Sequence, residues 1–303
     1  MPVTQVSLSG GTAHVEYDRT GTGPGLVLVH GTGATREQWL PLTEAVGDRF
    51  TVVAPDYSGS GGTTDHGGPL TLADLADEVL AAADHAGLDR FHLVGHSLGA
   101  AIATHLAAHH PDRVRSLVLH AGWAHTDTRL RAEFTYWLDL LRADAEHGTA
   151  NFARMLPLMA FGPRYWERTD TAANEELVRA LATTLAPGIA RQTEVDLSVD
   201  LRPLLGRVTA PTLVLASAHD RIMGADQQQA LLSGIPHTRY AEIDAGHGAP
   251  AEDPAGFTAL ISRFLDERRA AEAEAEAASG MCGRSAVPDA VGAPGRAAGP
   301  ARA

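Results

Sequence analysis

A serine bracketed by two glycines is the feature of this sequence that most directly suggests chemistry. Residues 95–99 read Gly-His-Ser-Leu-Gly, directly after the apolar run 91–94 and before an alanine-rich stretch. This order predicts a strand, a tight turn and a helix, with Ser97 at the apex of the turn. Such a turn has no room for side chains beside the nucleophile, and its apex exposes the serine hydroxyl toward a substrate. The backbone N–H of Leu98 would then face an anion forming beside Ser97.

A serine hydroxyl is a weak nucleophile at neutral pH, so it needs a base and a group that orients the base. Asp220 lies just past the apolar run 212–216, and His247 stands between two glycines shortly after the run 239–243. His247 can accept the serine proton and later return it, while Asp220 fixes the imidazole tautomer. Since each of the three residues follows a predicted strand, we expect Ser97, Asp220 and His247 to meet at one edge of a sheet.

A second donor for the developing anion is expected in the loop after the apolar run 26–29. This loop reads His-Gly-Thr-Gly over residues 30–33, and glycines let the backbone approach a substrate oxygen closely. We assign this role to the amide of Thr32, and we interpret His30 and His96 as packing and hydrogen-bonding residues. Some carboxylates are alternatives to Asp220 as the acid, with Asp127 in reserve and Asp244 and Asp226 as weaker candidates.

The elements that must position these residues alternate between strand and helix. A hairpin is expected from residues 3–8 and 12–17, around two glycines. Short, wholly apolar runs then suit strands buried on both faces of a parallel sheet, and they occur at residues 26–29, 51–54, 91–94, 116–119, 212–216 and 239–243. Helical spacing fills the gaps, for example over residues 72–83, with Thr71 and Asp74 as a capping pair. The alternation predicts a doubly wound α/β fold.

This alternation stops between residues 122 and 207, where helical patterns take over. We expect a helical lid over residues 122–207, a core formed by residues 1–121 and 208–278, and a disordered tail over residues 279–303. Eight of the sixteen aromatic residues lie between positions 123 and 166. They would build the core of the lid, line an apolar pocket, or do both. The pocket candidates are Trp123, Trp137, Phe152, Met155 and Met159.

Composition narrows the class of partner. A net charge of -13 disfavours nucleic acid and anionic membranes. No apolar run approaches the roughly 20 residues that span a bilayer, and no signal peptide is apparent, so we expect a cytoplasmic protein. The single cysteine, Cys282, excludes an intramolecular disulfide. His105 and His109 are spaced as a metal pair but lack a third ligand, so we expect no metal and no cofactor.

Taken together, these motifs resemble the α/β-hydrolase-fold serine hydrolases, and within them the lid-bearing esterases, enol-lactonases and carbon–carbon-bond hydrolases. The resemblance covers residues 3–265 and is carried by residues 30–33, 56–61, 95–99, 219–220 and 246–248. It implies a mostly parallel eight-stranded sheet flanked by helices, with the lid inserted after the sixth strand. Haloalkane dehalogenases and epoxide hydrolases of this type carry an aspartate where this chain has Ser97, which argues against both. Tyr57 and Ser58 replace the family's usual arginine or histidine after Asp56, so no role is transferred to them.

The predicted activity is hydrolysis of a small or medium apolar carboxylic ester, thioester or lactone through an acyl-enzyme. Ser97 would attack, His247 would act as base and then acid, and the Thr32 and Leu98 amides would bind the oxyanion. The alternatives are carbon–carbon bond hydrolysis of a β-diketone-like compound and acyl transfer or cyclisation in a biosynthetic pathway. A non-catalytic ligand-binding protein on the same fold is the alternative from another class. The expected partner is a small-molecule substrate, and the oligomeric state is left open.

Overall fold

An eight-stranded sheet forms the centre of the computed structural model, which describes residues 1–282 and residue 299. The spatial order of the strands is β1-β2-β4-β3-β5-β6-β7-β8. The predicted hairpin pairs β1 with β2, and β2 also runs antiparallel to β4, whereas the other neighbours are parallel. The predicted mostly parallel eight-stranded sheet is therefore confirmed. Its strands are β1 (Val3–Leu8), β2 (Gly11–Thr20), β3 (Gly25–Val29), β4 (Thr51–Pro55), β5 (Phe91–His96), β6 (Val114–His120), β7 (Thr212–Ser217) and β8 (Thr238–Ile243).

The central strands are apolar throughout because helices cover both of their faces. Successive side chains of a strand point to opposite faces, and β3 shows the consequence. Val27 and Val29 join one buried cluster with α2 (Leu72–His85) and α3 (Leu98–His109). Leu26 and Leu28 join a second cluster, with α1 (Leu40–Val46) and the start of α11 (Pro254–Cys282). The sheet is thus packed on both sides, as the unbroken apolar runs predict.

Local sequence signals determine where the long helix after β4 begins. The side chain of Thr71 accepts a hydrogen bond from the Asp74 amide at 3.1 Å, and the Asp74 carboxylate accepts one from the Thr71 amide at 3.0 Å. This reciprocal pair is the predicted capping box at the start of α2. The other short elements are the 3-10 helices η1 (Arg36–Trp39) and η2 (Leu205–Arg207), and the helices α9 (Ala225–Gly234) and α10 (Ala249–Glu252).

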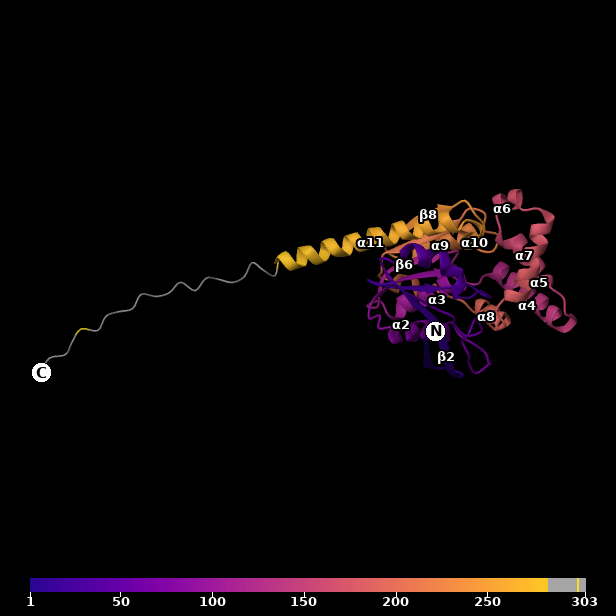
Figure 1. Cartoon of the computed structure of the whole chain (residues 1–303), viewed down its shortest axis with the longest axis horizontal. Helices are drawn as coiled ribbons and strands as arrows, with labels where there is room; N and C mark the ends of the chain where they lie inside the picture. Colours follow the sequence, from indigo (N-terminus) through magenta and orange to yellow (C-terminus); the bar gives the residue numbers. More distant parts are fainter. Residues whose placement is uncertain (283–298, 300–303) are drawn as a thin grey trace. The chain divides into compact units, whose positions relative to one another are not determined.

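Five helices, which we call the insertion helices, separate β6 from β7. They gather at one side of the first unit in Figure 1, coloured from magenta to orange. Contacts join α4 to α5, α5 to α7 and α4 to α8. That they act as a lid stays a prediction. Their bounds are α4 (Thr128–His147), α5 (Asn151–Ala160), α6 (Pro163–Arg168), α7 (Thr171–Thr184) and α8 (Ile189–Asp196).

The chain divides after Leu265 into two units, and every candidate site residue lies in the first, Met1–Leu265. The α11 helix continues to Cys282, so the tail expected from residue 279 falls almost wholly outside the described residues. Within the described part of the chain, none of the helices combines the length and apolar character needed to span a bilayer.

Candidate active site

Ser97 occupies a strained turn between β5 and α3. Its φ of 53° and ψ of -120° lie in a region that non-glycine residues rarely adopt. A Cβ at Gly95 would lie 2.2 Å from the carbonyl oxygen of Gly99, and a Cβ at Gly99 would lie 2.1 Å from that of Val29. Neither distance is sterically possible, so both glycines that bracket Ser97 are required by the close approach of the backbone.

His247 connects Ser97 to Asp220 through its two ring nitrogens. Its Nε2 lies 3.1 Å from the Ser97 hydroxyl, and its Nδ1 lies 2.9 Å from one oxygen of the Asp220 carboxylate. The other oxygen of Asp220 accepts the amide N–H groups of Ile222 and Met223, at 2.9 and 2.8 Å. The ring of His247 is therefore held in one orientation, with Nδ1 donating to Asp220 and Nε2 free to accept the serine proton.

The structure places the alternative acids elsewhere. Asp127 caps α4 by accepting the Leu130 amide at 2.9 Å, and this hydrogen bond is the main cause of its lowered pKa. Asp244 pairs with His219 at 2.8 Å and with Arg164 at 2.6 Å. Asp226 lies in the first turn of α9, beside Gln227. Among the described residues, only Asp220 contacts His247 through a carboxylate.

Two backbone amides beside Ser97 are available to an oxyanion. Leu98 is the first residue of α3, so its N–H belongs to the unpaired donors of a helix N-terminus. Thr32 lies in the loop that follows β3, and both Thr32 and Ser97 line the same cavity. Neither the Thr32 nor the Leu98 amide has a hydrogen-bond partner among the described residues. The two amides are therefore free to bind the negatively charged oxygen of a tetrahedral intermediate.

The α8 helix holds the loop that carries Thr32. The Thr32 hydroxyl donates to Asp196 at 2.9 Å, and the Gly33 amide donates to the side-chain oxygen of Gln192 at 2.8 Å. Gln192 and Asp196 are four residues apart and hence on one face of α8. Sequence reasoning missed both residues, because no local pattern links α8 to a loop some 160 residues earlier.

Asp196 has an unusual environment for a carboxyl group. Its side chain is fully buried, and one of its two oxygens has no hydrogen-bond partner within the described residues. Burial raises the pKa of Asp196 to about 8, and the hydrogen bond from Thr32 offsets only part of that rise. At neutral pH the carboxyl is therefore mainly protonated and neutral.

A pair of buried histidines, His96 and His120, lies next to His247. His96 and His120 share a hydrogen bond of 2.8 Å between their Nδ1 atoms, and His120 Nε2 lies 3.0 Å from the Ser217 hydroxyl. Burial, reinforced by neighbouring histidines, lowers the pKa of His96 well below its usual value and that of His120 to about 3. Both rings are neutral at physiological pH, so neither opposes the formation of a cation on His247. His30 is likewise buried, with a pKa lowered to about 4.

A cavity of about 220 Å³, which we call the inner cavity, opens beside Ser97 and His247. Two of the predicted pocket residues, Trp137 and Phe152, line it. Its other apolar lining residues, which sequence reasoning missed, are Ala34, Leu156, Ala160, Phe161, Leu181, Ile222 and Ala251.

The other three predicted pocket residues do not line the inner cavity. Trp123 is buried in the core, where its Nε1 donates to Thr126 at 3.0 Å. Met155 and Met159 pack, partly buried, against the main apolar cluster. On α5 the cavity contacts residues at intervals of four, starting from Phe152, and the two methionines lie to one side of that row.

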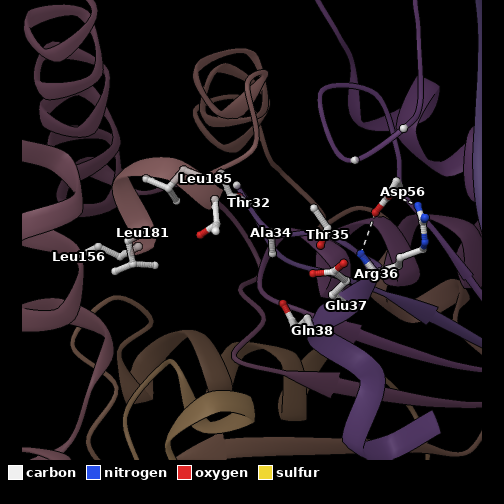
Figure 2. Close-up of a pocket in the computed structure, with 14 residues that line it drawn as sticks. Thr32, Ala34, Thr35, Arg36, Glu37, Gln38, Asp56, Leu156, Leu181 and Leu185 are labelled. Carbon is white, nitrogen blue, oxygen red and sulfur yellow. Dashed lines mark hydrogen bonds and ion pairs between the residues drawn. The ribbon is translucent and has the colours of Figure 1, made fainter. Parts of the chain in front are cut away.

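A second and larger cavity of about 600 Å³, the outer chamber, adjoins the first (Figure 2). The two share several lining residues, namely Thr32, Ala34, Gln38, Leu156 and Leu181. One wall of the outer chamber is apolar and includes Leu185, and the opposite wall carries Arg36 and Asp56, which contact each other (Figure 2).

The comparisons with known proteins agree with this geometry. The family model described as the alpha/beta hydrolase fold matches residues 24–254. A pyrrolizixenacetamide deacetylase from Xenorhabdus hominickii is 38% identical, over 84% of this chain and 96% of its own. A protein provisionally named as the carbamate hydrolase RutD, from Azorhizobium caulinodans, is 31% identical, over 85% of this chain and 97% of its own.

Among solved structures, an esterase from Thermogutta terrifontis superposes with a TM-score of 0.78 at 25% identity, over 88% of this chain and 99% of its own. The resemblance found in the sequence is thus confirmed at the level of the family and the enzyme class. The chain belongs to the α/β-hydrolase family and is a hydrolase.

Proposed function

We propose that this enzyme hydrolyses a carboxylic ester, thioester or lactone with a small, apolar acyl group, through an acyl-enzyme on Ser97. The observation that carries the proposal is the continuous hydrogen-bonded chain from Asp220 through His247 to Ser97, which ends in the inner cavity. The small volume and aromatic walls of that cavity support an acyl group that is short and apolar.

The reaction would begin with attack of the Ser97 oxygen on the substrate carbonyl carbon, while the serine proton moves to His247 Nε2. The tetrahedral oxyanion would accept hydrogen bonds from the Thr32 and Leu98 amides. Collapse of the intermediate breaks the bond to the leaving group, which takes the proton from His247. Water then attacks the acyl-enzyme by the same route, releasing the carboxylic acid and restoring Ser97.

Amide cleavage is the second candidate. The relative that is 38% identical carries the name of a deacetylase of an acetamide, and RutD carries that of a carbamate hydrolase. An amine is a poorer leaving group than an alcohol, so this reaction depends more strongly on proton donation by His247. The same residues would serve both reactions. His247 would protonate the leaving oxygen of an ester and the leaving nitrogen of an amide.

Product analysis tests the proposal. The purified protein and its Ser97→Ala variant would be incubated with esters, thioesters, lactones, amides and β-diketones of matched acyl length. We expect turnover of short-chain acyl substrates that falls by at least about 10⁴-fold in Ser97→Ala, with the fold retained by circular dichroism. Variant activity close to wild type would refute the role of Ser97. If β-diketones were the only compounds cleaved, with release of a ketone, the enzyme would be a carbon–carbon bond hydrolase.

Labelling by a fluorophosphonate separates the remaining alternatives. Wild-type protein that is labelled at Ser97 but hydrolyses none of these compounds would favour acyl transfer to an acceptor other than water. Protein that is neither labelled nor active would favour a binding role for the fold.

A further inference from the structure

We propose that the outer chamber binds the leaving group of the substrate, and that it favours a neutral or cationic leaving group over an anionic one. This inference rests on the proposed acyl-enzyme mechanism and deepens it by naming the substrate class. That class is a short-chain acyl ester or amide of a sizeable neutral or basic alcohol or amine.

The first argument is continuity between the two cavities. Their shared walls include Thr32, whose amide faces the oxyanion in the proposed mechanism, so the scissile bond lies where the cavities meet. Only the inner cavity is lined by Ser97 and His247. The outer chamber is nearly three times as large, at about 600 Å³ against about 220 Å³. A substrate spanning both would therefore place its smaller part beside the nucleophile.

The second argument is the order of the chemical steps. In an acyl-enzyme mechanism the leaving group departs first, while the acyl group stays bonded to the serine, and water then enters. The group that departs first needs the chamber with the wider opening to solvent, which is the outer one. The acyl group therefore occupies the inner cavity, and the outer chamber is emptied and admits water before deacylation.

The third argument is the charge of the polar wall (Figure 2). Arg36 contacts Asp56 and lies 2.7 Å from Glu16 and 3.2 Å from Asp18, so three carboxylates surround one guanidinium. Of these three carboxylates only Asp56 lines the chamber, and Glu37 adds a second carboxylate to the lining. The wall has an excess of negative charge, which repels an anionic leaving group and attracts a cationic one.

The opposite wall supplies apolar contact. Leu156, Leu181 and Leu185 project from α5 and from the segment at the end of α7 toward the chamber (Figure 2). A leaving group with an apolar body and a neutral or basic polar end would match both walls. An apolar wall facing a negatively charged wall disfavours a negatively charged leaving group, such as an alcohol that carries a carboxylate.

Matched benzyl esters provide the test of charge. Butyrate esters of 4-(aminomethyl)benzyl, 4-methylbenzyl and 4-carboxybenzyl alcohol share one acyl group and place the charge away from the reacting bond. We expect kcat/KM to be about tenfold higher for the cationic than for the anionic ester at low ionic strength, and the ratio to shrink in 0.5 M salt. The Glu37→Gln variant should reduce the ratio, and Glu37→Lys should reduce it further.

Matched size variants test which part of the substrate enters which cavity. Thr184 lines only the outer chamber and is exposed, whereas Ala160 lines only the inner cavity. We expect Thr184→Trp to lower kcat/KM about tenfold for bulky leaving groups without altering the preferred acyl length. Ala160→Val should shorten the preferred acyl length without altering the leaving-group ratio. Deacylation rates, measured after single-turnover acylation, should be unchanged in Thr184→Trp.

The outcomes separate this inference from the proposed function. A shift in acyl-length preference by Thr184→Trp, or equal rates for the three benzyl esters in every variant, would overturn the assignment of the outer chamber while Ser97-dependent turnover persists. Absence of an acyl-enzyme with every ester would instead refute the mechanism on which the assignment rests.

Discussion

Asp220 and Asp196 each hold one part of the candidate active site, but their surroundings differ. The Asp220 carboxylate accepts three hydrogen bonds, from His247 and from the amides of Ile222 and Met223. Asp196 accepts one, from the Thr32 hydroxyl, and its second oxygen is buried with no partner among the described residues. The first environment is built for a negative charge, whereas the second stabilises the neutral acid and raises the pKa of Asp196 to about 8.

The comparison shows that residue type alone does not determine what a carboxyl group does. Asp220 follows β7 at the edge of the sheet, where turn amides point at its side chain. Asp196 ends α8 in the insertion, where its side chain is buried. In the proposed mechanism Asp220 stabilises a cation on His247. Asp196 acts through Thr32 as a positioning residue for the loop at residues 30–34, which we call the oxyanion loop. Three predictions test this contrast.

Asp220→Asn should have the largest effect. Loss of the negative charge removes support for the His247 cation and allows the wrong tautomer, so we expect kcat to fall by about 10⁴-fold with little loss of structure. Stopped-flow or steady-state kinetics on the best ester would measure the change. Asp127→Asn is the matched control, since Asp127 caps α4 and Asn caps a helix as well as Asp does, so both kcat and stability should change little. Equal losses in the two variants would argue against the special role of Asp220.

Substitution of Asp196 should have a smaller effect that depends on the new side chain. Asp196→Asn keeps an acceptor for the Thr32 hydroxyl and should retain kcat within about threefold. Asp196→Ala leaves that hydroxyl unpaired and loosens the oxyanion loop, so we expect kcat to fall about 10- to 100-fold with a smaller change in KM. If Asn proved as damaging as Ala, the negative charge of Asp196 would be required and the contrast with Asp220 would fail.

The pH dependence of stability should show the smallest of the three effects. The pKa of Asp196 is raised on folding, so between about pH 4 and pH 8 the folded protein keeps a proton that the unfolded chain releases. Its contribution therefore makes the free energy of unfolding fall as the pH rises through this window. Asp196→Asn removes that dependence. Its free energy of unfolding, relative to that of wild type, should therefore be on the order of 2 kcal/mol greater at pH 8 than at pH 6.

Urea unfolding of both proteins at several pH values would measure this difference. Glu78, another buried carboxyl with a pKa raised to about 7, is present in both proteins and cancels in the comparison. A difference between the two proteins that did not change with pH would contradict the raised pKa of Asp196.

The parts of the site that the sequence predicted are those with local signals. Ser97 is marked by flanking glycines whose absent side chains leave space for the backbone, and Asp220 and His247 are marked by their places after apolar strands. The sheet was predictable for the same reason, because burial on both faces leaves an unbroken apolar run. Each of these signals lies within a few residues of the feature that it predicts.

The parts that the sequence did not predict depend on how distant segments pack. The hydrogen bond from Thr32 to Asp196 joins residues 164 positions apart, and no sequence pattern near either residue predicts it. The walls of the inner cavity depend on which side of each insertion helix faces Ser97. Trp123 precedes α4 and Leu156 lies within α5, and both are apolar. Only the packed structure separates the core residue from the lining residue.

The attachment of the oxyanion loop to α8 limits how modular this enzyme is. Because Gln192 and Asp196 come from the insertion, an exchange of the insertion between relatives would replace the supports of the loop together with the walls of the inner cavity. Substrate scope and turnover would then change together. In an engineering or evolutionary setting, the insertion and the loop at residues 30–34 would have to be inherited as one block.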